Sequence, residues 1–152
     1  MDEMIRLAEG GDIENISKFL DDHYRRDYFV PKKNIIRMVT GEIDPRFGKK
    51  RKPVYVYISY DDSGITGLAI LTRSLTLIQL LVRPDMRSQG IGSALLEYTK
   101  PDKIRCKRDV STGDPISYYL QRGYSGMQMT FDNTPALVGK NQNITIMERR
   151  KA

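Results

Sequence analysis

The stretch LVRPDMRSQGIGSALL, residues 81–96, joins the end of an apolar strand to the start of a helix through an arginine-bearing turn. The apolar residues before the turn end at Val82, and apolar residues at helical spacing follow it. Gly90 and Gly92 permit positive φ and close approach of the backbone at the mouth of the helix. The first N–H groups of a helix lack internal partners and carry the positive end of its dipole, and Arg87 adds a planar cation. The stretch therefore predicts a pyrophosphate-binding turn.

The same residues also have a plain structural interpretation, in which the glycines serve only the geometry of the turn and the arginine is solvated. The stretch is not a Walker loop, because the Gly-Lys-Ser/Thr sequence is missing. It is not a dinucleotide fingerprint either, because a third glycine is missing at the required place. The choice between an anion site and a simple turn depends on the rest of the chain.

The elements around this stretch are expected in the order β-α-α-β-β-β-α-β-α-β-β. The strand at 75–82 is apolar on both faces, as a central strand covered on both sides is. The step from residue 75 to residue 110 implies a parallel pair with a right-handed crossover, so the expected fold class is α/β, a mixed sheet with helices on both faces. Strands are expected at 4–8, 54–60, 65–73, 75–82, 103–110, 124–131 and 143–149, with a loop at 132–143 between the last two. Four helices are also expected. The first follows Asp12 as its N-cap, the second follows Pro31, and the others run from Ile91 to Lys100 and from Asp114 to Gly123.

The composition is that of an ordinary single-domain protein. The 152 residues suit one domain over 1–152, and the formal net charge of +6 favours an acidic partner or ligand. One cysteine, Cys106, and one histidine, His23, argue against an all-protein zinc site, and no metal is expected. A lone cysteine excludes an internal disulfide and fits a reducing compartment. We therefore expect a cytoplasmic protein with no signal peptide and no membrane helix.

The residues GEIDPRFGKKRKP, 41–53, are expected to form a loop, because Gly, Pro and charged residues dominate them. The basic run Lys49-Lys50-Arg51-Lys52 is interpreted first as a solvated part of that loop. The alternative is a patch for an acidic protein, a nucleic acid or the 3′-phosphate of an adenosine. A nucleic-acid partner is not favoured, because no aromatic residue interrupts the run.

The opening stretch resembles the acetyl-CoA-binding segment of the GNAT (general control non-repressible-related N-acetyltransferase) superfamily. That segment is an apolar strand, a proline and then Arg/Gln-x-x-Gly-x-Gly/Ala at a helix start, which Pro84, Arg87, Gly90 and Gly92 match. MIRLAEGGDIENISKFL also looks like the opening strand and helix of the family, and SYYLQRGY resembles its Tyr-x-x-x-Gly-Phe/Tyr segment. The expected order of elements is the family's order as well.

This resemblance implies a mostly antiparallel sheet of six to seven strands with a central splayed parallel pair, 75–82 and 103–110. It also implies that acetyl-CoA binds in the notch between these two strands and leaves as CoA. The contacts would come from the main chain of the strand end, from the arginine and from the amides of the turn. The cofactor-binding residues expected on this basis are Leu80, Leu81, Val82, Arg87, Ser88, Gln89, Gly90, Ile91, Gly92 and Ser93.

The implied chemistry is direct attack of an amine on the thioester through a tetrahedral intermediate, which an N–H group of the splayed strand can stabilise. By resemblance, Tyr119 is the acid that protonates the leaving thiolate. Tyr118 is the next candidate if the register slips by one residue. The plain interpretation of Tyr119 is a core aromatic on one face of a short helix.

The residue that removes a proton from the amine is not identified. Many relatives carry a glutamate in the strand before the glycines, but here that strand offers only Gln79 past Thr76. Asp109 and His23 are alternatives, since the first ends the following strand and the second titrates in the useful range. Water or an acid from another segment is preferred.

The expected function is therefore an N-acetyltransferase that moves an acetyl group from acetyl-CoA to a primary amine of a small molecule or a protein. A non-catalytic acyl-CoA-binding sensor or scaffold is the alternative, because the strand acid is missing. A third hypothesis, based on the net positive charge and the basic run, is a basic module that associates with nucleic acid. No membrane partner is expected, and the residues decide neither the acceptor nor the choice between monomer and dimer.

Overall fold

The computed structural model describes residues 4–24, 30–105, 116–129 and 135–138. These residues form a seven-stranded sheet in the order β1-β4-β5-β6-β7-β9-β8 and a separate two-stranded sheet of β2 and β3. The strands are β1 Met4–Leu7, β2 Glu42–Asp44, β3 Lys49–Arg51, β4 Val54–Asp61, β5 Gly64–Thr72, β6 Thr76–Val82, β7 Lys103–Arg105, β8 Ser125–Met129 and β9 Pro135–Val138. The helices are α1 Ile13–His23, α2 Lys32–Thr40, α3 Ile91–Thr99 and α4 Ile116–Leu120, with short 3-10 turns η1 Gly10–Asp12 and η2 Pro84–Met86.

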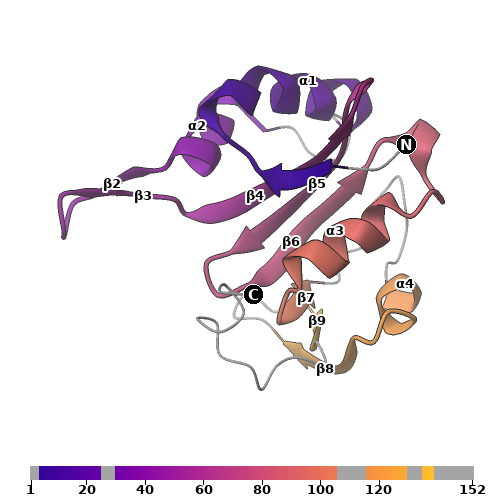
Figure 1. The fold of residues 1–152 in the computed structure, drawn as a ribbon. Coiled ribbons are helices and arrows are strands. Elements are labelled where there is room, and N and C mark those ends of the chain that lie inside the picture. Colours follow the sequence, from indigo (N-terminus) through magenta and orange to yellow (C-terminus); the bar gives the residue numbers. More distant parts are fainter. Residues whose placement is uncertain (1–3, 25–29, 106–115, 130–134, 139–152) are drawn as a thin grey trace.

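Helices cover both faces of the large sheet, as the sequence predicts (Figure 1). On one face, Ile16 and Leu20 of α1 and Ile35 of α2 pack against Leu68 of β5 in a buried core. The spacing of these residues along each helix turns one apolar stripe to the sheet. Within the described residues, no helix has the length and hydropathy to cross a membrane.

On the other face, α3 lies directly on the middle of the sheet. Ile91 and Leu95 belong to a second buried cluster, together with Leu77 of β6 and Ile104 of β7. A Cβ atom on Gly67 of β5 would lie 2.9 Å from Leu95 Cδ1 and 3.0 Å from Ile91 Cγ2. The helix therefore packs against bare backbone at this point, and the glycine sets how closely α3 approaches the sheet.

The parallel pair that the sequence predicts is formed by β6 and β7. Their register joins Thr76 to Lys103 and Leu77 to Ile104, and the described part of the pair ends there. At the same place the pairing of β6 with β5 shifts, which leaves Ile78 as an extra residue. Such a bulge bends a strand and increases its twist. The far half of β6 therefore continues on β5 alone within the described residues.

Two segments expected to be loops contain strands, so those expectations are wrong. In the segment 41–53, β2 and β3 pair as an antiparallel hairpin, with Glu42 opposite Arg51. In the segment 132–143, β9 lies between β7 and β8 in the large sheet. Pairing with a distant strand, or with an opposite charge across a hairpin, does not show in local composition. The strand expected at 143–149 lies outside the described residues.

Asp12 precedes α1 as expected, but its side chain does not cap that helix. The carboxylate accepts hydrogen bonds from the two Arg6 guanidinium nitrogens at 2.6 and 2.8 Å and from the Glu9 N–H at 2.8 Å. The Arg6 guanidinium lowers the pKa of this carboxyl group. Because Asp12 ends the turn η1, its side chain ties β1 to the start of α1. The other expected cap, at Asp114 and Pro115, falls outside the described residues.

The Gly67→Ala substitution should destabilise the fold, because the new methyl group would overlap Leu95 and the Ser59 hydroxyl, which lies 2.7 Å from the Cβ position. Overpacking of this kind costs about 1–3 kcal/mol in free energy of unfolding. The matched control is Gly11→Ala, where no atom lies within 4 Å of the Cβ position. Urea unfolding of the two variants and the parent measures the difference. A Gly67→Ala midpoint equal to that of Gly11→Ala would contradict this packing.

Candidate functional site

The turn that joins β6 to α3 has an unusual backbone. After η2, Ser88 and Gly90 both have positive φ, 67° and 84°. Gly90 is the N-cap of α3 and supplies no side chain to its first N–H groups. No atom lies within 4 Å of the Cβ position of Gly90, so the space before the helix is open. The turn thus leaves the N-terminus of α3 accessible, with Ser88 and Gln89 exposed beside it.

Arg87 is held beside this turn by a residue that sequence reasoning did not place there. The Arg87 Nη2 group donates a hydrogen bond of 3.1 Å to the Tyr24 hydroxyl. That hydroxyl in turn donates to the Val82 carbonyl oxygen. Tyr24 is buried and lies at the end of α1, so it links α1, the end of β6 and the arginine. A guanidinium has five N–H donors, so this bond orients Arg87 without exhausting it.

The far half of β6 directs some of its main-chain groups away from β5. The Arg83 N–H donates to the Thr66 carbonyl at 2.8 Å, and the register places Leu81 opposite Leu68. Because facing pairs alternate in an antiparallel ladder, the main chain of Leu81 faces β5. The N–H and carbonyl of Leu80, and the N–H of Val82, face the opposite side, where β6 and β7 separate. Leu81 therefore presents neither its main-chain N–H nor its carbonyl group to that gap.

At the first turn of α3, residues of α4 and of the following segment gather. The Arg122 Nε group donates to the Ser93 hydroxyl at 2.9 Å, and its Nη1 group donates to the Tyr118 carbonyl at 2.8 Å. The guanidinium also lies 3.5 Å from the centroid of the Tyr118 ring. The Tyr118 hydroxyl is 2.5 Å from the Cβ position of Gly92. Arg122 is thus a second cation near the start of α3. The sequence did not predict this position, because the spacing of Arg122 from the glycine motif matches no known pattern.

The other expected residues of the turn are placed as follows. Gly92 is buried against Tyr118, and Ile91 belongs to the core beneath α3. Tyr119 is 6% exposed and packs in the same core, with ring centroids 5.3 Å from Tyr118 and 6.5 Å from Tyr124. Burial and the nearby Glu97 charge raise the pKa of Tyr124 to about 12, so that hydroxyl stays protonated in neutral solution.

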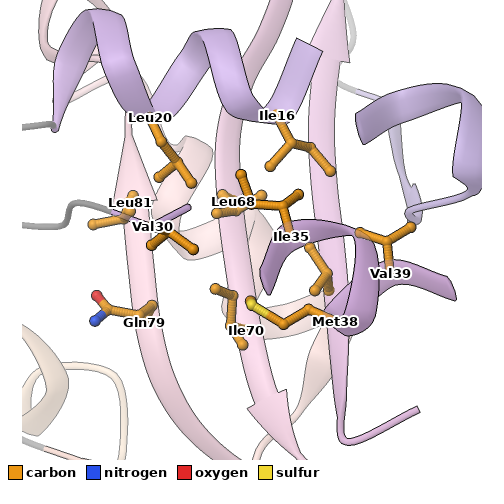
Figure 2. Close-up of a pocket in the computed structure, with 11 residues that line it drawn as sticks. Ile16, Leu20, Val30, Ile35, Met38, Val39, Leu68, Ile70, Gln79 and Leu81 are labelled. Carbon is orange, nitrogen blue, oxygen red and sulfur yellow. The ribbon is translucent and has the colours of Figure 1, made fainter. Parts of the chain in front are cut away.

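A small apolar cavity of about 40 Å³ lies between β6 and the pair of helices α1 and α2. Figure 2 shows Gln79 as the one polar side chain among the residues labelled around it. Its lining includes Leu20, Ile35 and Ile70. Gln79 is the only polar residue past Thr76 in the strand where many relatives carry a glutamate, and an amide has no basic group to offer here.

The alternative bases receive little support from their positions. His23 sits in the last turn of α1, with its ring edge-on to Phe19 at 5.4 Å between centroids. This is the packing expected of a boundary residue. Asp109 lies outside the described residues.

Comparison with known proteins agrees with this architecture. Residues 52–125 match the family model described as an acetyltransferase (GNAT) domain. The PaiA N-acetyltransferase of Thermoplasma acidophilum, solved with coenzyme A, has 15% identity and a TM-score of 0.64, covering 92% of this chain and 99% of that one. An acetyltransferase of Thermus thermophilus has 12% identity and a TM-score of 0.65, covering 91% and 96%. The GNAT domain of PAT from S. lividans has 13% identity and a TM-score of 0.62, covering 88% and 87%.

No curated protein matches the chain significantly. The structural likenesses concern the fold, since the identities are low. The matched segment runs from the strands β4, β5 and β6 through the glycine turn to α4, and so contains the turn, Arg87 and Arg122 but not Tyr24. The match to the acetyltransferase (GNAT) domain over residues 52–125 confirms the resemblance to the GNAT superfamily that is seen in the sequence.

The contact between Gly92 and the Tyr118 hydroxyl can be tested by a double-mutant cycle. Gly92→Ala should clash with the hydroxyl and so destabilise the parent or leave it unchanged. In the Tyr118→Phe background the clash is absent, and the same change should stabilise by up to about 1 kcal/mol, because alanine suits a helix better than glycine. Thermal and urea unfolding of the parent, the two single variants and the double variant give the coupling free energy between the two positions. Effects that add to within about 0.5 kcal/mol would show that the hydroxyl does not lie over Gly92.

Proposed function

We propose that this protein binds acetyl-CoA and transfers its acetyl group to a primary amine. The observation that carries this proposal is the open N-terminus of α3 at Gly90, with the Arg87 guanidinium held beside it through Tyr24. A helix start and an oriented arginine together suit a diphosphate, the anionic part of CoA. A Cβ at Gly90 would meet nothing within 4 Å, so a ligand has room to approach the backbone there.

Each part of the cofactor has a candidate partner in the chain. The amides of Ser88, Gln89, Gly90, Ile91, Gly92 and Ser93 would hold the pyrophosphate, with Arg87 adding charge. The main-chain groups of Leu80 that face away from β5 suit hydrogen bonds to the pantetheine arm. The N–H of Val82, or that of Leu80, is a candidate donor to the thioester carbonyl oxygen as negative charge develops there.

When bound, acetyl-CoA supplies an activated acetyl group, and the chain must handle two protons. The amine has an ordinary pKa of about 10 and must lose a proton before it attacks. Water or an acid of another segment is proposed for this, since Gln79 is an amide. Tyr119 is proposed as the acid for the leaving thiolate, and the Tyr118 hydroxyl, placed over Gly92, as a contact on the cofactor side.

A non-catalytic acyl-CoA-binding domain is the second candidate, favoured by the amide at Gln79. The two functions differ in turnover. Acetyl-CoA is incubated with a panel of small amines and peptide N-termini, and release of free thiol is followed. Turnover above background supports the enzyme. Tight CoA binding by calorimetry with no thiol release across the panel supports the binding domain, and no CoA binding contradicts both.

Arg87→Ala should weaken CoA binding by about 1.5–3 kcal/mol, the usual value of a hydrogen bond to a charged group. This corresponds to roughly a tenfold to hundredfold rise in Kd. The matched control is Arg37→Ala, which removes the same charge from an exposed position on α2, 3.7 Å from Glu42. Isothermal titration calorimetry measures both. A stably folded Arg87→Ala protein with the affinity of the parent would show that the turn does not hold the pyrophosphate.

The two tyrosines of α4 should respond differently to loss of their hydroxyl groups. Tyr119→Phe should lower kcat and leave CoA affinity nearly unchanged, because a proton donor acts in the transition state. Tyr118→Phe should instead raise the Kd for CoA, because its hydroxyl lies at the first turn of α3. Steady-state kinetics and calorimetry separate the two. A loss of kcat in Tyr118→Phe alone would move the acid to that residue.

A further inference from the structure

The hairpin of β2 and β3 projects from the rest of the fold (Figure 1). It also carries a dense positive charge. From Glu42 to Lys52 it has five basic residues and two acidic ones. Such an excess of cations on one projecting element attracts a polyanion rather than a single small ligand. We propose that this hairpin binds single-stranded nucleic acid.

The tip of the hairpin supplies an aromatic surface beside the charge. Phe47 is 64% exposed, and the Arg46 guanidinium lies 5.4 Å from the centroid of its ring. Ile43 is 68% exposed and lies opposite Lys50 in the ladder, so the two share a face of the ribbon. Proteins that bind single strands combine cations along the phosphates with aromatic rings on which bases stack. The aromatic residue missing from the basic run itself is thus provided at the turn of the hairpin.

The base of the hairpin extends the same surface. A groove of about 400 Å³ is lined by Arg46, Arg51, Lys52 and Arg73, with Glu42 as its acidic member. The Arg73 Nη1 group donates to the Lys52 carbonyl at 3.0 Å, which fixes the hairpin to the end of β5. A groove with four cations and one carboxylate suits a phosphate chain that runs along the ribbon. An acidic peptide would use the charges but not the exposed ring.

This surface lies at the opposite end of the sheet from the turn at Gly90. The hairpin leads into β4 at Val54, which pairs with Thr72, whereas the end of β6 at Val82 pairs with Gly67. Nucleic-acid binding at the hairpin is therefore independent of the proposed cofactor site. The two can fail separately in experiment.

The test uses the full chain and fluorescence anisotropy with labelled oligouridylate, oligothymidylate, a DNA duplex and a polyglutamate peptide. The parent should bind both single strands, and binding should weaken steeply between about 50 and about 200 mM salt. Equal affinity for the uridylate and thymidylate supports contacts to phosphate and base faces, and a preference for the uridylate supports an RNA ligand. No binding at low salt, or tighter binding of the duplex or the peptide, would overturn the proposal.

Two variants and one control sharpen the test. The triple variant Lys49→Gln, Lys50→Gln, Lys52→Gln should bind at least about tenfold more weakly. Its slope of log affinity against log salt should also be shallower by about two, because three cations no longer release counterions. Phe47→Ser should lose about fivefold to a hundredfold at every salt concentration, because stacking of a base is lost. The control is Lys18→Gln, Lys33→Gln, Lys100→Gln, which removes the same charge elsewhere.

The control triple variant should bind almost as the parent does, and all variants should keep the circular dichroism spectrum and the CoA affinity of the parent. An equal loss in the two triple variants would show an effect of net charge alone and overturn the assignment to the hairpin. Full affinity in Phe47→Ser would overturn the stacking contact, and with it the preference for single strands.

Discussion

The packing of α3 on the bare backbone of Gly67 is the constraint on which the site depends. Ile91 and Leu95 lie so close to this glycine that a methyl group there would overlap them. That contact fixes the first turn of α3 at the end of β6, where the turn through Gly90 can present amide groups to a ligand. If α3 packed a side chain's width further from the sheet, those amides would lie away from the gap beside β6.

A second constraint comes from the separation of β6 and β7. The bulge at Ile78 changes which face each later residue meets and bends the strand. The Tyr24 hydroxyl then connects the end of β6 to Arg87. These contacts join the end of α1 to the end of β6 and the turn after it, two parts of the chain that are far apart in sequence. The arginine is therefore oriented by the fold around it before any ligand arrives. Preorganised charge of this kind binds an anion without the cost of ordering the side chain.

Much of the fold was predictable because its signals are local. The strand at 75–82, the turn with Gly90 and the helix after it follow from apolar periodicity and from glycine. The parallel pair follows from the strand–helix–strand order between residues 75 and 110, because a helical crossover lets the second strand run in the same direction as the first. The hairpin of β2 and β3 and the strand β9 were missed, because a strand exists only with its partner and the pairing of Glu42 with Arg51 does not appear in composition.

The sequence by itself determined the class of fold, the turn that suits a diphosphate and the lack of an acid in β6, since these depend on residue type and short spacing. Only the tertiary structure decided that Tyr24 orients Arg87, that Arg122 lies by the first turn of α3, and that the Tyr118 hydroxyl covers Gly92. The physical reason is distance along the chain. Hydrogen bonds between residues tens of positions apart form only when the packed cores on both faces of the sheet bring their elements together.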